Sequence, residues 1–194
     1  PYTDRCERLL RKQLGAGGVV LTTSGTHALE MTSLLLDLGP GDEFIVPSFA
    51  FVTTASAFCM SGARPVFSDV RPDTLNLDPE ILPRLITPRT KAIVALHYAG
   101  ISCDMDAIGE IAARYGIPVV EDNALGLYGA HRARPLGTIG TFGILSFHET
   151  KSLGCGEGGA LIINDPAYIE RAQVIRDVGT DRSSFLRGGI DRYT

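Results

Sequence analysis

The chain has 194 residues, of which 44% are hydrophobic, and its formal net charge is -4. This length can bury one sizeable core, and an acidic balance without a run of Lys or Arg argues against nucleic acid or an anionic membrane as a partner. No apolar run reaches the ~20 residues that span a bilayer. We therefore expect a cytoplasmic protein with no nucleic-acid or membrane partner, which acts on small molecules.

The cysteines, the histidines and the chain ends give further expectations about disulfides, metal sites and truncation. The four cysteines form no C-x-x-C pair, which favours buried free thiols over a disulfide or zinc framework. The four histidines lack metal-ligand spacing, so we predict no metal site. The chain opens directly in a helical pattern and stops at 191–194 without a closing element, so we expect it to be truncated at both ends.

Hydrophobic periodicity predicts an alternation of helices and strands along the whole chain. In chain order we expect a helix at 6–14, a strand at 19–21, a helix at 28–38, a strand at 44–46, a helix at 52–60, a strand at 65–67, a short helix at 79–86, a strand at 92–96, a helix at 105–115, strands at 117–120, 142–145 and 161–163, and a helix at 168–178 before a polar tail. This alternation predicts one α/β domain over residues 1–194, with a mostly parallel sheet between two helical layers. Working residues should then follow the carboxyl ends of the strands.

Lys151 lies between the strand expected at 142–145 and a glycine-rich turn at 156–159. A lysine forms a covalent link to a carbonyl compound when a partly desolvated site lowers its pKa, and pyridoxal 5'-phosphate (PLP) is the commonest carbonyl that proteins hold in this way. A surface lysine in a loop is the alternative for any single lysine. The remaining features of a PLP site decide between the two interpretations.

A phosphate group needs backbone N–H groups at a helix N-terminus, and the turn Ser24-Gly25-Thr26, followed by His27, can supply them. The glycine allows close approach, and Thr26 adds a hydroxyl donor. An ordinary helix N-cap is the alternative interpretation. Ser146 ends a strand five residues before Lys151 and is a second candidate for the phosphate. A serine bonded only to its own strand end is the alternative there.

Two further residues fit the ring of PLP. Asp122 ends an apolar strand, where a carboxylate is costly unless it pairs with a cation such as the protonated pyridine nitrogen. A turn aspartate is the alternative. Phe51 follows another strand and could stack on the ring face, and Phe49 is its rival for this role.

These residues resemble, along the whole chain, the sugar aminotransferases of the DegT/DnrJ/EryC1/StrS family. The resemblance is carried by the segments at 24–29, 41–43, 46–49, 62–67, 87–93, 97–100, 121–122, 146–151 and 156–160. It implies the large domain of PLP-dependent transferases of fold type I, without the small C-terminal domain. It also implies a homodimer with shared active sites, which moves an amino group from glutamate to the keto group of a nucleotide-linked 4-keto-6-deoxy sugar.

The resemblance assigns a role to each matching position. It implies that Lys151 links PLP and moves protons, that Asp122 pairs with the pyridine nitrogen, and that Phe51 stacks. Thr26 and Ser146 are expected to hold the phosphate, with Gly25 and His27 beside the cofactor. Related dehydratases carry histidine at the position of Lys151, so the lysine favours transamination.

The chain also departs from the family pattern. Leu125 stands where Gln or His usually lies near the phenolic oxygen of the cofactor, Asn123 replaces a usual alanine, and Ser152 replaces a common asparagine. Leucine cannot donate a hydrogen bond, so the electronic tuning of the cofactor is altered at Leu125. In the tail, Arg182, Arg187 and Tyr193 are candidate contacts for a nucleotide diphosphate, although solvated surface is the alternative interpretation.

Two other functions compete with transamination. The glycines at 154–159 satisfy the dinucleotide pattern G-x-G-x-x-G, but they lead into an expected strand rather than a helix. A non-catalytic PLP-fold fragment is the second rival, because of the expected truncation and of Leu125.

Overall fold

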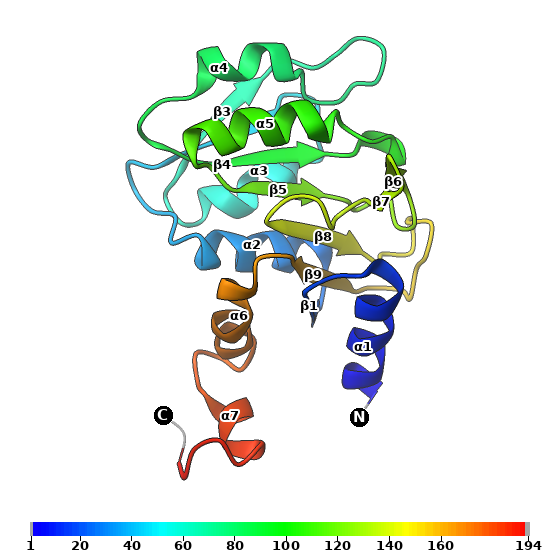
Figure 1. The fold of residues 1–194 in the computed structure, drawn as a ribbon, viewed down its shortest axis with the longest axis vertical. Helices are drawn as coiled ribbons and strands as arrows, with labels where there is room; N and C mark the ends of the chain where they lie inside the picture. The colour runs from blue at the N-terminus through cyan, green and yellow to red at the C-terminus, as the bar shows by residue number, and fades with distance from the viewer. Residues whose placement is uncertain (1, 193–194) are drawn as a thin grey trace.

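The computed structural model describes residues 2–192, which form a seven-stranded sheet between helices (Figure 1). The helices are α1 (Tyr2–Leu14), α2 (Gly25–Leu35), α3 (Val52–Cys59), α4 (Leu82–Leu85), α5 (Met105–Tyr115), α6 (Ile169–Arg176) and α7 (Arg182–Leu186). The strands are β1 (Gly18–Thr22), β2 (Glu43–Pro47), β3 (Arg64–Ser68), β4 (Thr90–Leu96), β5 (Val119–Asp122), β6 (Ala130–His131), β7 (Arg134–Pro135), β8 (Phe142–Ser146) and β9 (Gly159–Ile163). Within residues 2–192, none of the helices combines the length and apolar character needed to cross a membrane.

The main sheet has the strand order β1-β9-β8-β5-β4-β2-β3. The pairs β2–β3, β2–β4, β4–β5 and β5–β8 are parallel, whereas β9 runs antiparallel to both of its neighbours. The strands β2, β4, β5 and β8 therefore end at one edge of the sheet. The sheet is mostly parallel, as the alternating sequence pattern predicts.

Two helical layers cover the sheet. On one face, α2, α3 and α6 pack on inward side chains such as Phe44, Val94 and Phe142. On the other face, α4 and α5 pack on Ile45 and Ile93, and α1 packs beside them on β1, β8 and β9. The predicted three-layer α/β/α architecture is thus confirmed. In Figure 1, α1 and the α6–α7 segment extend beyond the β1 edge of the sheet.

Local signals set the ends of the helices. Asp104 caps α5 by accepting a hydrogen bond from the backbone N–H of Ala107 at 3.2 Å, and Gly116 ends this helix in the left-handed region with φ 67°. The helix expected at 28–38 ends earlier, at Leu35, because the chain turns at Asp37 with φ 52°.

Three further details differ from the sequence-based expectations. The short β6–β7 hairpin and α7 were not predicted, because two-residue strands and a five-residue polar helix carry no periodicity. The cysteines are free, as predicted, but the expectation that they are buried is wrong for Cys59 and Cys155, which are exposed. Cys103 is buried, and burial raises the pKa of its thiol to about 12.

Candidate active site

A cavity of about 810 Å³ opens where the parallel strands end. The expected site residues on its wall come from four separate segments of the chain, which the parallel topology brings to one edge of the sheet. They are Gly25, Thr26, His27, Phe51, Asp122, Ser146 and Lys151.

The turn between β1 and α2 forms one end of the cavity. Ser24 is the N-cap of α2, and its hydroxyl accepts a hydrogen bond from the backbone N–H of His27 at 3.1 Å. The N-cap interpretation is therefore correct for Ser24, yet it leaves the N–H groups of the first helical turn to face an anion. A Cβ atom on Gly25 would lie 3.1 Å from Cβ of Ser146, so the glycine lets the turn approach the end of β8.

Asp122 supplies a buried carboxyl group at the end of β5. Its side chain is 3% exposed, and it accepts hydrogen bonds from the Thr54 hydroxyl at 2.7 Å and the Ala124 backbone N–H at 3.3 Å. Burial raises the pKa of this carboxyl, while Thr54, Ala124, Lys151 and His97 act in the opposite direction. A cationic group in the cavity would therefore be stabilised by Asp122.

Lys151 lies in the turn between β8 and β9. Its backbone N–H donates to the carbonyl of His148 at 2.9 Å, and the His148 ring contacts the Thr150 hydroxyl at 2.8 Å. Glu157 lies across the turn, with its carboxylate 3.8 Å from the His148 ring. The half-buried Lys151 side chain reaches the cavity wall from this turn.

Close packing against the β1–α2 turn explains a glycine in the glycine-rich run after Lys151. A Cβ atom on Gly159 would lie 2.3 Å from the backbone carbonyl carbon of Ser24, so only glycine fits where β9 meets the β1–α2 turn. Gly159 opens the strand β9 and not a helix. The dinucleotide pattern at 154–159 therefore lacks the strand–turn–helix context that NAD binding needs.

The structure also separates the two aromatic candidates. Phe51 lies on the cavity wall and is 71% exposed, so its ring is available to a ligand. Phe49 instead packs on Tyr98, with ring centroids 4.9 Å apart. Phe51 thus remains the candidate for stacking.

Three of the predicted contacts are absent from the described cavity wall, and a fourth lies outside the described residues. Leu125 is half-buried and is absent from the described wall, where its neighbour Ala124 lies instead. Arg182 is exposed at the start of α7, and Arg187 donates a hydrogen bond to Gln173 at 3.2 Å. Tyr193 falls outside the described residues.

Sequence reasoning missed several residues of the cavity wall. Thr54 lies one helical turn after Phe51, the N-cap of α3. This i, i+3 spacing could have predicted that Thr54 faces the same side as Phe51. His148 and Glu157 carried no signal beyond their closeness to Lys151 in the sequence. The other unpredicted polar residues on the wall are Thr23, Thr53 and Thr150, whereas Ser24 belongs to the turn expected to hold the phosphate.

Three residues outside the cavity could in principle bind a metal ion, although the sequence predicts no metal site. Asp104, Asp106 and His131 place one ligand atom each within 4.8 Å of one another. Asp106 already pairs with Arg132 at 2.9 Å and with Arg134 at 2.7 Å, which oppose binding of a cation. We assign no function to this group, and the absence of a metal site stays a prediction.

The residues of the cavity fit PLP on structural grounds alone. The buried Asp122 carboxyl lacks a cationic partner close enough to form an ion pair among the described residues, and a protonated pyridine nitrogen would provide one. Gly25 and Ser146 form a cradle that a larger side chain at position 25 would crowd. Lys151 supplies the amine on the same wall.

Comparison with known proteins decides the family. The model of the DegT/DnrJ/EryC1/StrS aminotransferase family matches residues 1–189. The chain belongs to this family. It is 40% identical over 193 residues to UDP-2-acetamido-2-deoxy-3-oxo-D-glucuronate aminotransferase of Pseudomonas aeruginosa, covering 98% of this chain and 54% of the relative. It is 38% identical to the spore coat polysaccharide biosynthesis protein SpsC of Bacillus subtilis, covering 96% of this chain and 48% of the relative.

Solved structures confirm the fold. The PLP form of the putative sugar aminotransferase Spr1654 from Streptococcus pneumoniae superimposes with a TM-score of 0.86 at 29% identity, over 100% of this chain and 53% of that one. The fold is that of the PLP-dependent aminotransferases of fold type I, as the resemblance implied. The chain spans about half the length of the curated relatives that it matches.

Proposed function

We propose that this chain binds PLP and belongs to an aminotransferase that moves an amino group from glutamate to the keto group of a nucleotide-linked sugar. The observation that carries the proposal is the single cavity that joins Lys151, Asp122 and the cradle of Gly25 and Ser146. The names of the relatives support the sugar class. A cytoplasmic location stays a prediction.

The residues divide the work of the reaction. When bound, PLP supplies an electron sink that stabilises negative charge at the carbon next to the transferred nitrogen. Lys151 would hold the cofactor covalently, and its free amine would carry the proton that leaves the α-carbon of the amino donor. Asp122 keeps the ring nitrogen protonated, and Thr54 orients Asp122.

The remaining wall residues hold and cover the cofactor. We assign the phosphate to Ser146 and to Thr26 with the N–H groups of the first turn of α2. His27 lies beside this group, with its ring against the Thr23 hydroxyl. Phe51 lies on the cavity wall and would cover one face of the ring. Leu125, which the described wall does not include, would offer the cofactor no hydrogen bond.

The sugar is proposed at the level of its reacting group. The tail from Gly179 resembles dTDP-4-amino-4,6-dideoxygalactose transaminase, which favours a 4-keto-6-deoxy sugar. The Pseudomonas relative is named for a 3-oxo sugar acid, so a 3-keto sugar is the competing substrate. Turnover of one panel of keto-sugar nucleotides with glutamate decides between them, with Arg182 and Arg187 as candidate contacts to the diphosphate.

A homodimer with shared active sites is part of the proposal. Phe51 and Val52 are 71% and 68% exposed beside the cavity, and Phe67 is 57% exposed. Large apolar side chains exposed next to a ligand cavity suit a protein interface. Light scattering of the purified protein would test this assembly.

The cofactor assignment is tested by mixing the protein with PLP, reducing with borohydride and mapping the modified peptide by mass spectrometry. We expect the label on Lys151, and we expect Lys151→Ala to abolish both label and turnover. Lys91→Ala is the matched control, because Lys91 is exposed at the start of β4, away from the cavity. Failure of wild-type protein to form the adduct would favour a non-catalytic PLP-fold fragment.

A further inference from the structure

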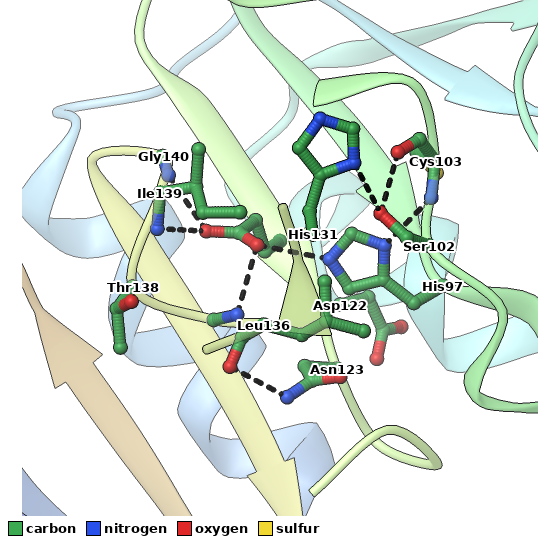
Figure 2. Close-up of polar contacts among 12 residues, drawn as sticks. His97, Ser102, Cys103, Asp122, Asn123, His131, Leu136, Thr138, Ile139 and Gly140 are labelled. Atoms are coloured by element: carbon green, nitrogen blue, oxygen red, sulfur yellow. Dashed lines mark hydrogen bonds and ion pairs between the residues drawn. The ribbon is translucent and has the colours of Figure 1, made fainter. Parts of the chain in front are cut away.

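Glu121 is a fully buried carboxylate with four hydrogen-bond donors around it. Figure 2 labels His97, Ile139 and Gly140 among the donor residues. One oxygen accepts from His97 Nε2 at 2.9 Å and from the Gly137 backbone N–H at 2.8 Å. The other accepts from the backbone N–H groups of Ile139 and Gly140, both at 2.6 Å. A buried carboxylate is stable only when it is satisfied in this way.

His97, which follows β4, has a defined tautomer. Its Nδ1 atom accepts a hydrogen bond from the Cys103 backbone N–H at 3.2 Å, so the ring proton lies on Nε2 and is donated to Glu121. Both side chains of this pair are 0% exposed. Neither residue lines the described wall of the cavity. Direct contact with a ligand therefore does not explain why these two polar side chains are buried together.

Glu121 and Asp122 point to opposite faces of β5, because successive side chains of a strand alternate. Asp122 faces the cavity, and Glu121 faces the far side. The His97 backbone N–H donates to the Asp122 carbonyl at 3.1 Å, so the His97–Glu121 contact closes a second link between the ends of β4 and β5. This double link restrains the backbone from which the Asp122 carboxyl projects.

The other three bonds of Glu121 hold a loop against β8. The loop at 137–140 lies directly on Gly143, where a Cβ atom would come within 2.1 Å of the Gly137 carbonyl oxygen. Gly143 is the register partner of Glu121, and Ser146 ends the same strand. Glu121 therefore ties the end of β5 to β8 through this loop.

We propose that Glu121 and His97 are positioning residues, a buried pair that fixes Asp122 on β5 relative to Ser146 on β8. This inference rests on the proposed function, in which Asp122 meets the ring nitrogen and Ser146 meets the phosphate of one rigid cofactor. The two contacts must match a fixed molecular length, so a small shift between the strands weakens both. The pair itself touches neither cofactor nor substrate.

Glu121→Gln tests the pair with minimal change in shape. The new amide can accept from Ile139 and Gly140, but its NH2 group faces the donors of His97 and Gly137. The matched control is Glu43→Gln, because Glu43 is also buried and hydrogen-bonded but lies at the amino end of β2, away from the cavity. Both variants should lose thermal stability, and only Glu121→Gln should also bind PLP less tightly.

We expect PLP affinity, measured by absorbance titration of folded protein, to fall at least about tenfold in Glu121→Gln, the scale found for residues that orient a binding group from behind. The affinity of Glu43→Gln should equal that of the wild type. Equal affinities in all three proteins would overturn the positioning role but leave the PLP proposal intact. Absence of PLP binding by the wild type would overturn both.

A second pair of variants covers the case in which Glu121→Gln does not fold. His97→Gln keeps a donor toward Glu121 and should retain most of the PLP affinity, whereas His97→Phe removes it and should not. Equal losses in both variants would contradict the hydrogen-bond role. Independently of the cofactor, ¹⁵N NMR of the His97 ring at neutral pH should show the proton on Nε2, and a proton on Nδ1 would overturn the assignment.

Discussion

The Thr54 hydroxyl lies 2.7 Å from Oδ2 of Asp122, which joins the first turn of α3 to the end of β5. The two residues are 68 positions apart in the sequence, and both are buried. Asp122 must remain ionised to hold a cation although burial raises its pKa. Thr54 offsets part of that burial cost.

Thr54→Val should therefore destabilise the folded protein by about 1–3 kcal/mol, because the Asp122 carboxyl loses a buried donor. Urea unfolding measures this loss. Thr32→Val is the matched control, since Thr32 is also buried but its hydroxyl bonds only to Ala28 of its own helix at 2.9 Å. PLP affinity should fall in the Thr54 variant alone. Equal PLP affinity in the two variants would show that Thr54 does not orient Asp122.

Asp122→Asn should separate stability from binding. The amide oxygen still accepts from Thr54, and only the longer 3.3 Å contact from the Ala124 backbone N–H is lost. Because the charge that burial disfavours is removed, the protein without cofactor should become more stable at neutral pH. PLP binding should weaken by about 1.5–3 kcal/mol, because a charged hydrogen bond to the ring nitrogen is lost. Calorimetry without PLP and absorbance titration with PLP measure the two effects.

The pH dependence of the Asp122→Asn effect has a definite sign. A carboxyl whose pKa is raised by folding destabilises the native state progressively as pH rises above its unfolded value of 3.8. The stability gap between variant and wild type should thus close below that pH and widen toward neutrality. A gap that is constant with pH would mean that the Asp122 charge is not its cause.

Glu43 should show the opposite pH dependence at the other edge of the sheet. Hydrogen bonds from Thr87 and Arg64, with a further contribution from Arg89, lower its pKa from 4.5 to about 2. The stability from this group is fully present above 4.5 and is lost as pH falls toward 2. Unfolding of Glu43→Gln should therefore depend less on pH in this window than unfolding of the wild type. Parallel pH profiles would contradict the contribution of Glu43.

The sequence allowed prediction of the features that depend on local pattern. Apolar runs gave the seven strands of the sheet, and the parallel topology then placed Asp122, Ser146 and Phe51 at one edge. Contacts between distant segments were not predictable in this way. Thr54 and Asp122 meet because the folded chain brings the first turn of α3 to the end of β5. The spacing of apolar residues along the sequence does not predict such a contact.

Two residues near Asp122 show the same limit of sequence-based prediction. Leu125 was expected at the cofactor and is not on the described wall, whereas the contacts of Glu121 were not predicted. Leu125 was placed at the cofactor by resemblance, whereas in the structure Ala124 takes the wall position. Glu121 was noted only as a neighbour of Asp122, because strand alternation indicates that it faces away but not that His97 and the loop at 137–140 meet it there.

Gly159→Ala tests whether the glycine-rich run has a steric role rather than a flexible one. The new Cβ atom would lie 2.3 Å from the carbonyl carbon and 2.4 Å from the carbonyl oxygen of Ser24, so backbone must move where β9 meets the β1–α2 turn. We expect a loss of about 1–3 kcal/mol in unfolding free energy, as for other overpacked sites. PLP affinity should also fall, since the displaced turn carries Gly25 and Thr26.

Gly109→Ala is the control for this substitution. Gly109 lies inside α5, and its Cβ atom would meet nothing within 4 Å. Alanine should stabilise the protein there by about 0.5–1 kcal/mol, because it restricts the unfolded chain and favours the helix. If Gly159→Ala were as well tolerated as Gly109→Ala, the close contact between β9 and Ser24 would not hold the turn. The position of Gly25 and Ser146 at the phosphate would then have to depend on contacts other than the one between Gly159 and Ser24.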